Sequence, residues 1–126
     1  MKLGIVGSRR RNSAEDYILL IERVKALKPT MIISGGCGEG ADHFAEKIAK
    51  DFGIPILIYH PQLLRLEDYK RWEVIEAMYA RNEQIAMASE ALIALVAEDR
   101  KGGTENTISY FKKCKPTTWK DCLEIL

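Results

Sequence analysis

Short runs of apolar residues alternate along the chain with longer segments in which apolar residues recur every three or four positions. Continuous apolar runs are typical of strands buried on both faces, and the longer spacing is typical of amphipathic helices. The runs predict strands over residues 2–7, 30–34, 54–60 and 91–97. The spacing predicts helices over residues 14–27, 41–52, 66–89 and 104–113. The tail, residues 115–126, is expected to supply a fifth, edge strand and a short terminal segment.

Local signals mark several of these boundaries. Ser13 is a predicted N-cap, and Glu15 and Asp16 suit the positive end of the helix that follows. Gly53 is the expected C′ residue of the second helix, and Thr104 is the expected cap of the last one. These signals support the alternation of strands and helices.

Alternating apolar strands and helices indicate a parallel sheet covered on both faces. Right-handed crossovers then favour a single Rossmann-like, doubly wound α/β domain with a parallel sheet of about five strands. This domain is expected to span residues 1–126.

Three loops are expected to meet at the carboxyl edge of this sheet, where open α/β sheets bind their ligands. They cover residues 7–12, 35–42 and 101–106, and each leads into a helix N-terminus, which favours anions. One glycine loop alone is more often a structural turn, but three on one edge predict a phosphate-bearing ligand. A run of three arginines is usually a solvated surface, yet the position of Arg9 directly after Gly7-Ser8 makes it the best candidate to bind phosphate. The predicted ligand-binding residues of these loops are Gly7, Ser8, Arg9, Ser34, Gly35, Gly36, Gly38, Gly40, Gly103 and Thr104.

Composition narrows the classes of function. The net charge is +1, so anion recognition has to be local. No apolar run reaches the roughly 18 residues of a membrane span, and the N-terminus lacks a signal-peptide pattern, so we expect a cytoplasmic protein without a membrane partner.

The three cysteines form no CxxC pair and His43 and His60 are the only histidines, so neither a disulfide framework nor a metal is expected. GxGxxG and GxxxxGK[ST] are missing, which disfavours dinucleotide dehydrogenases and nucleoside triphosphatases. No cofactor is expected.

Four segments, taken in order, resemble the SLOG superfamily of Rossmann-like nucleotide-ligand proteins. They are "GIVGSR", "IISGGCGEGADHFAEKIAKDFGIPI", "YARNEQIAMASEALIAL" and "GGTENTI", which together cover most of residues 3–108. The resemblance implies a nucleotide or nucleotide-derived ligand, bound by a sensor or carrier domain. It also implies that Arg81 and Asn82 contact ribose or a second phosphate, and that Asp42 belongs to the ligand site.

The same superfamily includes phosphoribohydrolases, which release the base from a nucleoside monophosphate and carry a PGGxGTxxE motif. Arg81 matches their helix arginine, whereas Thr107 stands where their glutamate is expected. Hydrolysis of an N-glycosidic bond needs a carboxylate beside the developing oxocarbenium ion. Glu39, Asp42 or Glu105 would have to supply it, and Asp42 has a rival role in binding the N–H groups of its own turn. Binding is therefore our first expectation, and an N-glycoside hydrolase using Arg81 and one of these carboxylates is the alternative.

The long helix admits two further interpretations. Tyr69, Trp72 and Tyr79 alternate there with basic residues, as in single-stranded nucleic-acid binding, but the net charge of +1 disfavours this class. Trp72, Ile75, Met78 and Tyr79 also form a stripe suited to self-association. The expected partners are a nucleotide-type small molecule and a second copy of the chain, as a homodimer.

Overall fold

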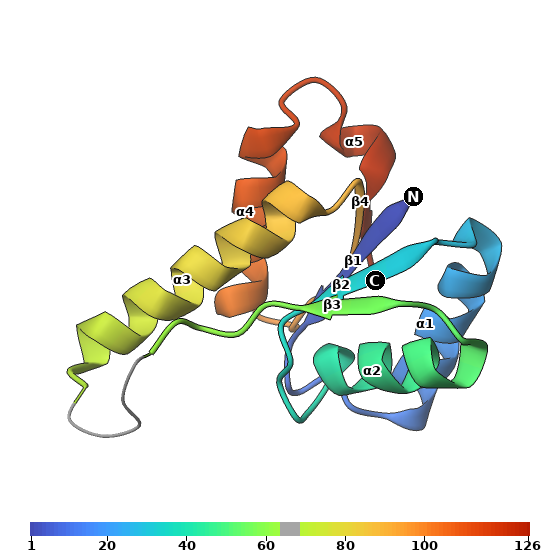
Figure 1. Ribbon diagram of the computed structural model, residues 1–126, viewed down its shortest axis with the longest axis horizontal. Helices are drawn as coiled ribbons and strands as arrows, with labels where there is room; N and C mark the ends of the chain where they lie inside the picture. Colours follow the sequence, from blue (N-terminus) through green and yellow to red (C-terminus); the bar gives the residue numbers. More distant parts are fainter. Residues whose placement is uncertain (64–68) are drawn as a thin grey trace.

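The computed structural model describes residues 1–63 and 69–126 and consists of one parallel sheet with helices on both faces (Figure 1). The five strands are β1 (Lys2–Gly7), β2 (Met31–Ser34), β3 (Ile56–Ile58), β4 (Ala91–Leu95) and β5 (Leu123–Ile125). The helices of the described residues are α1 (Ala14–Leu27), α2 (Ala41–Phe52), α3 (Arg71–Ala88), α4 (Gly103–Cys114) and α5 (Trp119–Cys122).

The strands lie in the order β3-β2-β1-β4-β5, and all neighbouring pairs are parallel. The chain moves outward from β1 to β3, crosses back over β1, and continues through β4 to β5. This order confirms the predicted doubly wound, Rossmann-like fold. It also places the reversal of strand order between β1 and β4, whose carboxyl ends form the usual ligand crevice of such sheets.

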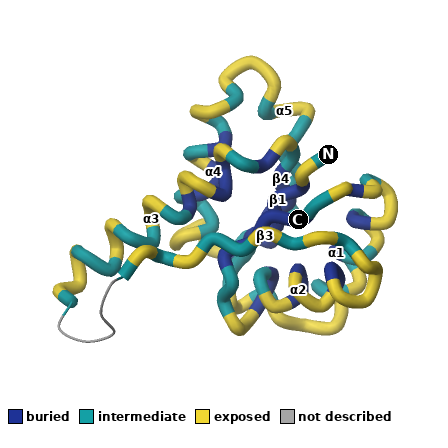
Figure 2. Tube along the Cα trace, viewed as in Figure 1, coloured by how far each residue is buried: buried dark blue, intermediate teal, exposed yellow. Residues whose placement is uncertain are grey.

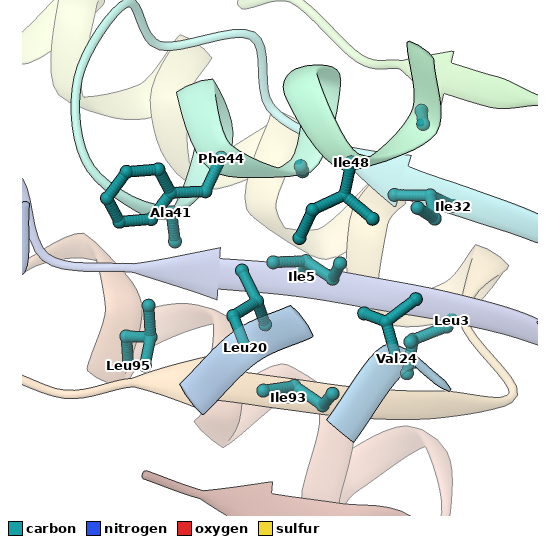
Figure 3. Close-up of a cluster of buried hydrophobic side chains, with 12 residues drawn as sticks. Leu3, Ile5, Leu20, Val24, Ile32, Ala41, Phe44, Ile48, Ile93 and Leu95 are labelled. Atoms are coloured by element: carbon teal, nitrogen blue, oxygen red, sulfur yellow. The ribbon is translucent and has the colours of Figure 1, made fainter. Parts of the chain in front are cut away.

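Two hydrophobic layers hold the helices against the sheet. On one face, Leu20 and Val24 of α1 and Ile48 of α2 pack on Ile5 and Ile93 (Figure 3). On the other face, α3 and α4 pack on Val6, Ile33, Leu92 and Ala94. Successive residues of β4 therefore enter opposite layers, which explains why the central strands are apolar at every position. Figure 2 shows this buried centre between exposed outer helix surfaces.

Most predicted elements are confirmed. The bounds of β1, α1 and α2 agree with the prediction to the residue. β3 covers only part of the predicted 54–60, because the Ile54 N–H donates to the Ala49 carbonyl at the end of α2 and Pro55 has no N–H. β4 ends at Leu95 rather than residue 97, and β5 is the edge strand expected in the tail.

The long helix begins later than predicted. Of the predicted 66–89, residues 66–68 lie outside the described part of the chain, and α3 starts at Arg71. Its N-terminal half extends past the carboxyl edge of the sheet (Figure 1). Trp72, Ile75 and Tyr79 of this half are 57%, 38% and 45% exposed. None of the helices in the described residues has the length and apolar content needed to cross a membrane.

Two of the three predicted helix boundaries are confirmed. The Ser13 hydroxyl accepts the Asp16 N–H at 3.1 Å, within a complete capping box, and Gly53 ends α2 with a φ of 65°. The prediction of Thr104 as a cap is wrong, because α4 begins at Gly103. Gly102 is the N-cap and has a φ of 110°, a conformation that glycine adopts easily, so the chain enters the helix before Thr104.

Candidate functional site

A pocket of about 470 Å³ opens at the carboxyl ends of β1 and β4, where the strand order reverses. The loop after β1, the turn after β2, one side of α3 and the loop after β4 form its walls. The predicted residues that line it are Gly7, Ser8, Arg9, Gly35, Asp42, Arg81, Asn82, Gly103 and Thr104. The predicted residues that do not line it are Ser34, Gly36, Gly38, Glu39, Gly40 and Glu105.

The three consecutive arginines after β1 have three different environments. Arg9 is exposed and lines the pocket, and its side chain forms no ion pair or hydrogen bond with any described residue. Arg10 also lines the pocket, but its charge is paired with Asp99 at 2.8 Å. Arg11 binds Asp16 and donates to the Leu126 carbonyl at 2.7 Å, so it joins α1 to the C-terminal segment. Arg9 is therefore the arginine of this run that is best placed to bind an anion.

The helix N-termini at this edge also differ. The first turn of α1 is capped by Ser13 and Asp16, so its N–H groups and its positive end already have partners. The N-cap of α4 is Gly102, whose lack of a side chain leaves the first N–H groups of that helix without a side-chain cap. Gly102, Gly103 and Thr104 all line the pocket. Because uncapped helix N-termini attract anions, α4 supplies the better phosphate position.

At most glycines of the turn after β2, neighbouring protein atoms leave no room for a side chain. A Cβ on Gly35 would lie 2.7 Å from Nη1 of Arg81, and one on Gly40 would lie 2.7 Å from the Ser8 carbonyl oxygen. Gly36 and Gly40 have φ angles of 72° and 68°, which disfavour any side chain. Gly38 has nothing within 4 Å of its Cβ position. The turn is therefore a packed wall that touches the pocket through Gly35, Cys37 and Asp42.

Asp42 lies in the first turn of α2 and faces both the turn and the pocket. Its Oδ2 accepts the Cys37 N–H at 3.0 Å, which confirms the predicted role in binding the turn. Burial raises the pKa of the Asp42 carboxyl above its ordinary value of 3.8, although the Cys37 N–H and the charge of Arg81 favour the ionised form. The buried Ser34 hydroxyl also favours ionisation, but it forms no hydrogen bond of normal geometry within the described residues.

Arg81 and Asn82 connect three walls of the pocket. Arg81 donates through Nη1 to the Gly35 carbonyl at 2.7 Å and through Nε to Oδ1 of Asn82 at 3.0 Å. Asn82 is buried and donates through Nδ2 to Oδ1 of Asn106 at 3.0 Å and to the Gly103 carbonyl at 3.4 Å. The two residues thus join α3 to the turn after β2 and to the N-terminal turn of α4.

The other predicted carboxylates are used elsewhere or lie outside the pocket. Glu105 forms a two-pronged ion pair with Arg100 at 2.8 and 2.9 Å, and Glu39 is exposed. The Thr107 hydroxyl donates to the Gly103 carbonyl of its own helix at 3.2 Å. Asp42 is therefore the one carboxylate among the described lining residues.

The charges around the pocket favour an anionic ligand. Four basic side chains line it, and Asp42 is the one acidic side chain among the described lining residues; the basic ones are Arg9, Arg10, Arg81 and Lys101. The charged groups of Arg9 and Lys101 have no partner among the described residues. A smaller cavity of about 310 Å³ at the opposite edge is lined by Glu90, Asp121 and Glu124, and would repel an anion.

Sequence reasoning missed part of this site. The prediction includes Lys101 in a candidate loop but not among the ligand-binding residues, although its position beside Gly102 is a usable signal. The sequence pattern assigns Ile75, Met78 and Tyr79 to self-association, yet they line the pocket. Their role could not be read from helical spacing, because the same stripe suits a partner helix or a ligand.

We compared the chain with protein-family models, curated proteins and solved structures, and none matched. The geometry of the pocket therefore carries the functional argument.

Proposed function

We propose that the protein binds a nucleotide or a nucleotide-derived ligand, bearing phosphate and ribose, in the pocket at the carboxyl edge of the sheet. The observation that carries this proposal is that the uncapped N-terminus of α4 and Arg9, which has no side-chain partner among the described residues, line the same cavity. Backbone N–H groups and a guanidinium are the usual protein donors to phosphate oxygens. The role is that of a sensor or carrier domain.

The polar middle of the pocket supports a sugar beside the phosphate. Arg81 uses Nε and Nη1 within the protein, which leaves Nη2 for a ligand. Asp42 lies in the same lining and uses Oδ2 for the Cys37 N–H, which leaves its Oδ1 to accept a hydrogen bond from a ligand hydroxyl group. A phosphate ester of a polyol therefore suits the pocket better than a free anion.

Thermal unfolding and calorimetry with a panel of nucleoside monophosphates, dinucleotides and ADP-ribose test the proposal. A ligand that binds only the folded state raises the melting temperature as its concentration exceeds the dissociation constant. Arg9→Gln is expected to weaken binding about ten- to hundredfold without changing the melting temperature of the free protein, because charge-assisted hydrogen bonds contribute about 1.5–3 kcal/mol. Arg71→Gln removes the same charge from an exposed residue that does not line the pocket, and should leave binding unchanged. If no compound of the panel shifted the melting curve at millimolar concentration, the proposal would be wrong.

An N-glycoside hydrolase is the second candidate, favoured by the position of Asp42. This carboxyl lines the pocket beside Arg81, and its raised pKa suits an exchange of protons with a ligand. Chromatography of nucleotides incubated with the protein tests this function. Base release that disappears in Asp42→Asn and persists in Glu39→Gln and Glu105→Gln would support it. Saturable binding without base release would leave binding alone.

We also propose that the chain is a SLOG-like domain, working in the cytoplasm as a homodimer. The order of strands and loops supports the family, and the three free cysteines suit a reducing compartment. Trp72 supports self-association, because it is exposed on α3 and does not line the pocket. Sedimentation that gave a monomer at high micromolar concentration, with no change in Trp72→Glu, would argue against the dimer.

A further inference from the structure

The outer half of α3 gives the pocket an apolar wall that phosphate and ribose do not use. Ile75, Met78 and Tyr79 all line the cavity, at positions i, i+3 and i+4 of one helix face. Ile75 and Tyr79 remain 38% and 45% exposed. Large side chains left open beside four basic groups indicate a ligand with an apolar part as well as an anionic part.

Tyr79 is the aromatic side chain of this wall. Its ring makes no aromatic or cation–π contact, and its hydroxyl makes no hydrogen bond, with any described residue. By contrast, Phe52 on α2 is similarly exposed, at 42%, and is covered in part by the ammonium group of Lys25. A free aromatic face in a pocket is suited to stacking against a flat heterocycle.

The helix also fixes the order of the binding groups. Asn82 donates to the Gly103 carbonyl and therefore marks the end of the pocket beside the N-terminus of α4. Tyr79 and Ile75 precede it by three and seven residues, which is about 4.5 and 10 Å along a helix. Going outward along α3, the pocket thus runs from phosphate donors, past Arg81 and Asn82, to an aromatic and aliphatic wall. A sugar ring is of a size to bridge these two ends.

We propose that Tyr79, supported by Ile75 and Met78, is the stacking platform for the base, and that it makes the pocket selective for nucleotides over simple sugar phosphates. This inference rests on the proposed function and extends it to the residue that sets specificity. The inference also divides the exposed apolar side chains of α3 into two groups. Tyr79 contacts the ligand, whereas Trp72 does not line the pocket and can contact a second copy of the chain.

Calorimetry with adenosine, guanosine, cytidine and uridine 5′-monophosphates and with ribose 5-phosphate tests the inference. The wild-type protein should bind at least one nucleotide about ten- to hundredfold more tightly than ribose 5-phosphate, as stacking of one base on one aromatic ring would give. Tyr79→Ala should remove most of this preference and leave ribose 5-phosphate binding unchanged. Tyr79→Phe should keep the preference, since the ring and not the hydroxyl carries it. Phe52→Ala is the matched control and should change neither affinity.

Different failures have different meanings. If ribose 5-phosphate bound the wild-type protein as tightly as every nucleotide, the inference would be overturned and the proposed function would stand. The inference would also be overturned if Tyr79→Ala weakened both kinds of ligand equally or neither, or if it changed the sedimentation coefficient instead of the selectivity. If neither these five compounds nor the dinucleotides and ADP-ribose bound at millimolar concentration, the proposed function itself would be wrong.

Discussion

Two glycine-rich segments lead into helices at the same edge of the sheet, and their glycines have different neighbours. In the turn after β2, the Cβ positions of Gly35, Gly36 and Gly40 lie 2.7 Å from other protein atoms. In the loop after β4, Gly102 has nothing within 4 Å of its Cβ position, and Gly103 has only Nδ2 of Asn82, at 3.7 Å. The first segment needs glycine for packing. The second leaves its backbone open to a ligand, so glycine content alone does not distinguish a structural turn from a binding loop.

The largest expected effect is the loss of folding stability in Gly40→Ala. Gly40 combines a φ of 68° with a Cβ position 2.7 Å from the backbone oxygen of Ser8, which cannot move as a side chain can. Strain and overpacking together should lower the free energy of unfolding by about 3 kcal/mol, measured by urea denaturation.

Gly38→Ala is the control within the same turn. Gly38 lacks a positive φ and has open space around it, so this change should stay within about 0.5 kcal/mol. Equal effects of the two substitutions would mean that the turn is not packed as described.

The next effect in size is expected for Gly35→Ala. The new methyl group would meet the end of the Arg81 side chain, which would have to release the Gly35 carbonyl. Loss of this hydrogen bond should cost about 1 kcal/mol of folding stability, by the usual contribution of one bond, and displacement of Arg81 should weaken ligand binding. In an Arg81→Ala background the same substitution should cost clearly less, because only Oδ2 of Asp42, 3.1 Å from the Cβ position, would then have to move. Additive costs in this double-mutant cycle would contradict the mechanism.

These differences explain which parts of the site could be predicted. The alternation of strands and helices determined the topology, and the topology brought the three loops to one edge. Ser13 and Gly53 carry local signals, so the ends of α1 and α2 were predictable to the residue. The role of each glycine was not, because it depends on atoms distant in sequence, such as Arg81 beside Gly35 and His60 beside Gly36. The three arginines after β1 likewise differ through their partners elsewhere in the chain, which are Asp99 for Arg10 and Asp16, Val96 and Leu126 for Arg11.

Gly103→Ala should separate binding from folding. Gly103 is the first residue of α4, and its Cβ position has only an ordinary contact with Asn82. Folding stability should stay within about 0.5 kcal/mol of the wild-type value, since alanine favours a helix more than glycine does. A phosphate held against this backbone would be bound several-fold more weakly. An unchanged affinity in calorimetry would show that the ligand does not approach the loop closely.

The smallest effect concerns the charge of Asp42, where the packed turn meets the pocket. Burial raises the pKa of this carboxyl in the folded state, so the folded protein takes up a proton more readily than the unfolded chain. The resulting stabilisation is fully present below the unfolded pKa, near 3.8, and is lost as the pH rises through the folded pKa. The stability of the wild-type protein relative to Asp42→Asn should therefore increase as the pH is lowered from 7 towards 4.

Asp99 provides a control of opposite sign for this titration. Its ion pair with Arg10 lowers the pKa of the Asp99 carboxyl, so its contribution is present above pH 3.8 and is lost as the pH falls through the lowered folded pKa. The stability of the wild-type protein relative to Asp99→Asn should thus decrease on acidification, in urea titrations at the same pH values. The effect at Asp42 is limited, because the Cys37 N–H and the charge of Arg81 oppose the desolvation. If the stability of the wild-type protein relative to Asp42→Asn also decreased on acidification, burial would not destabilise the ionised form of Asp42, and the turn after β2 would not bury its carboxylate.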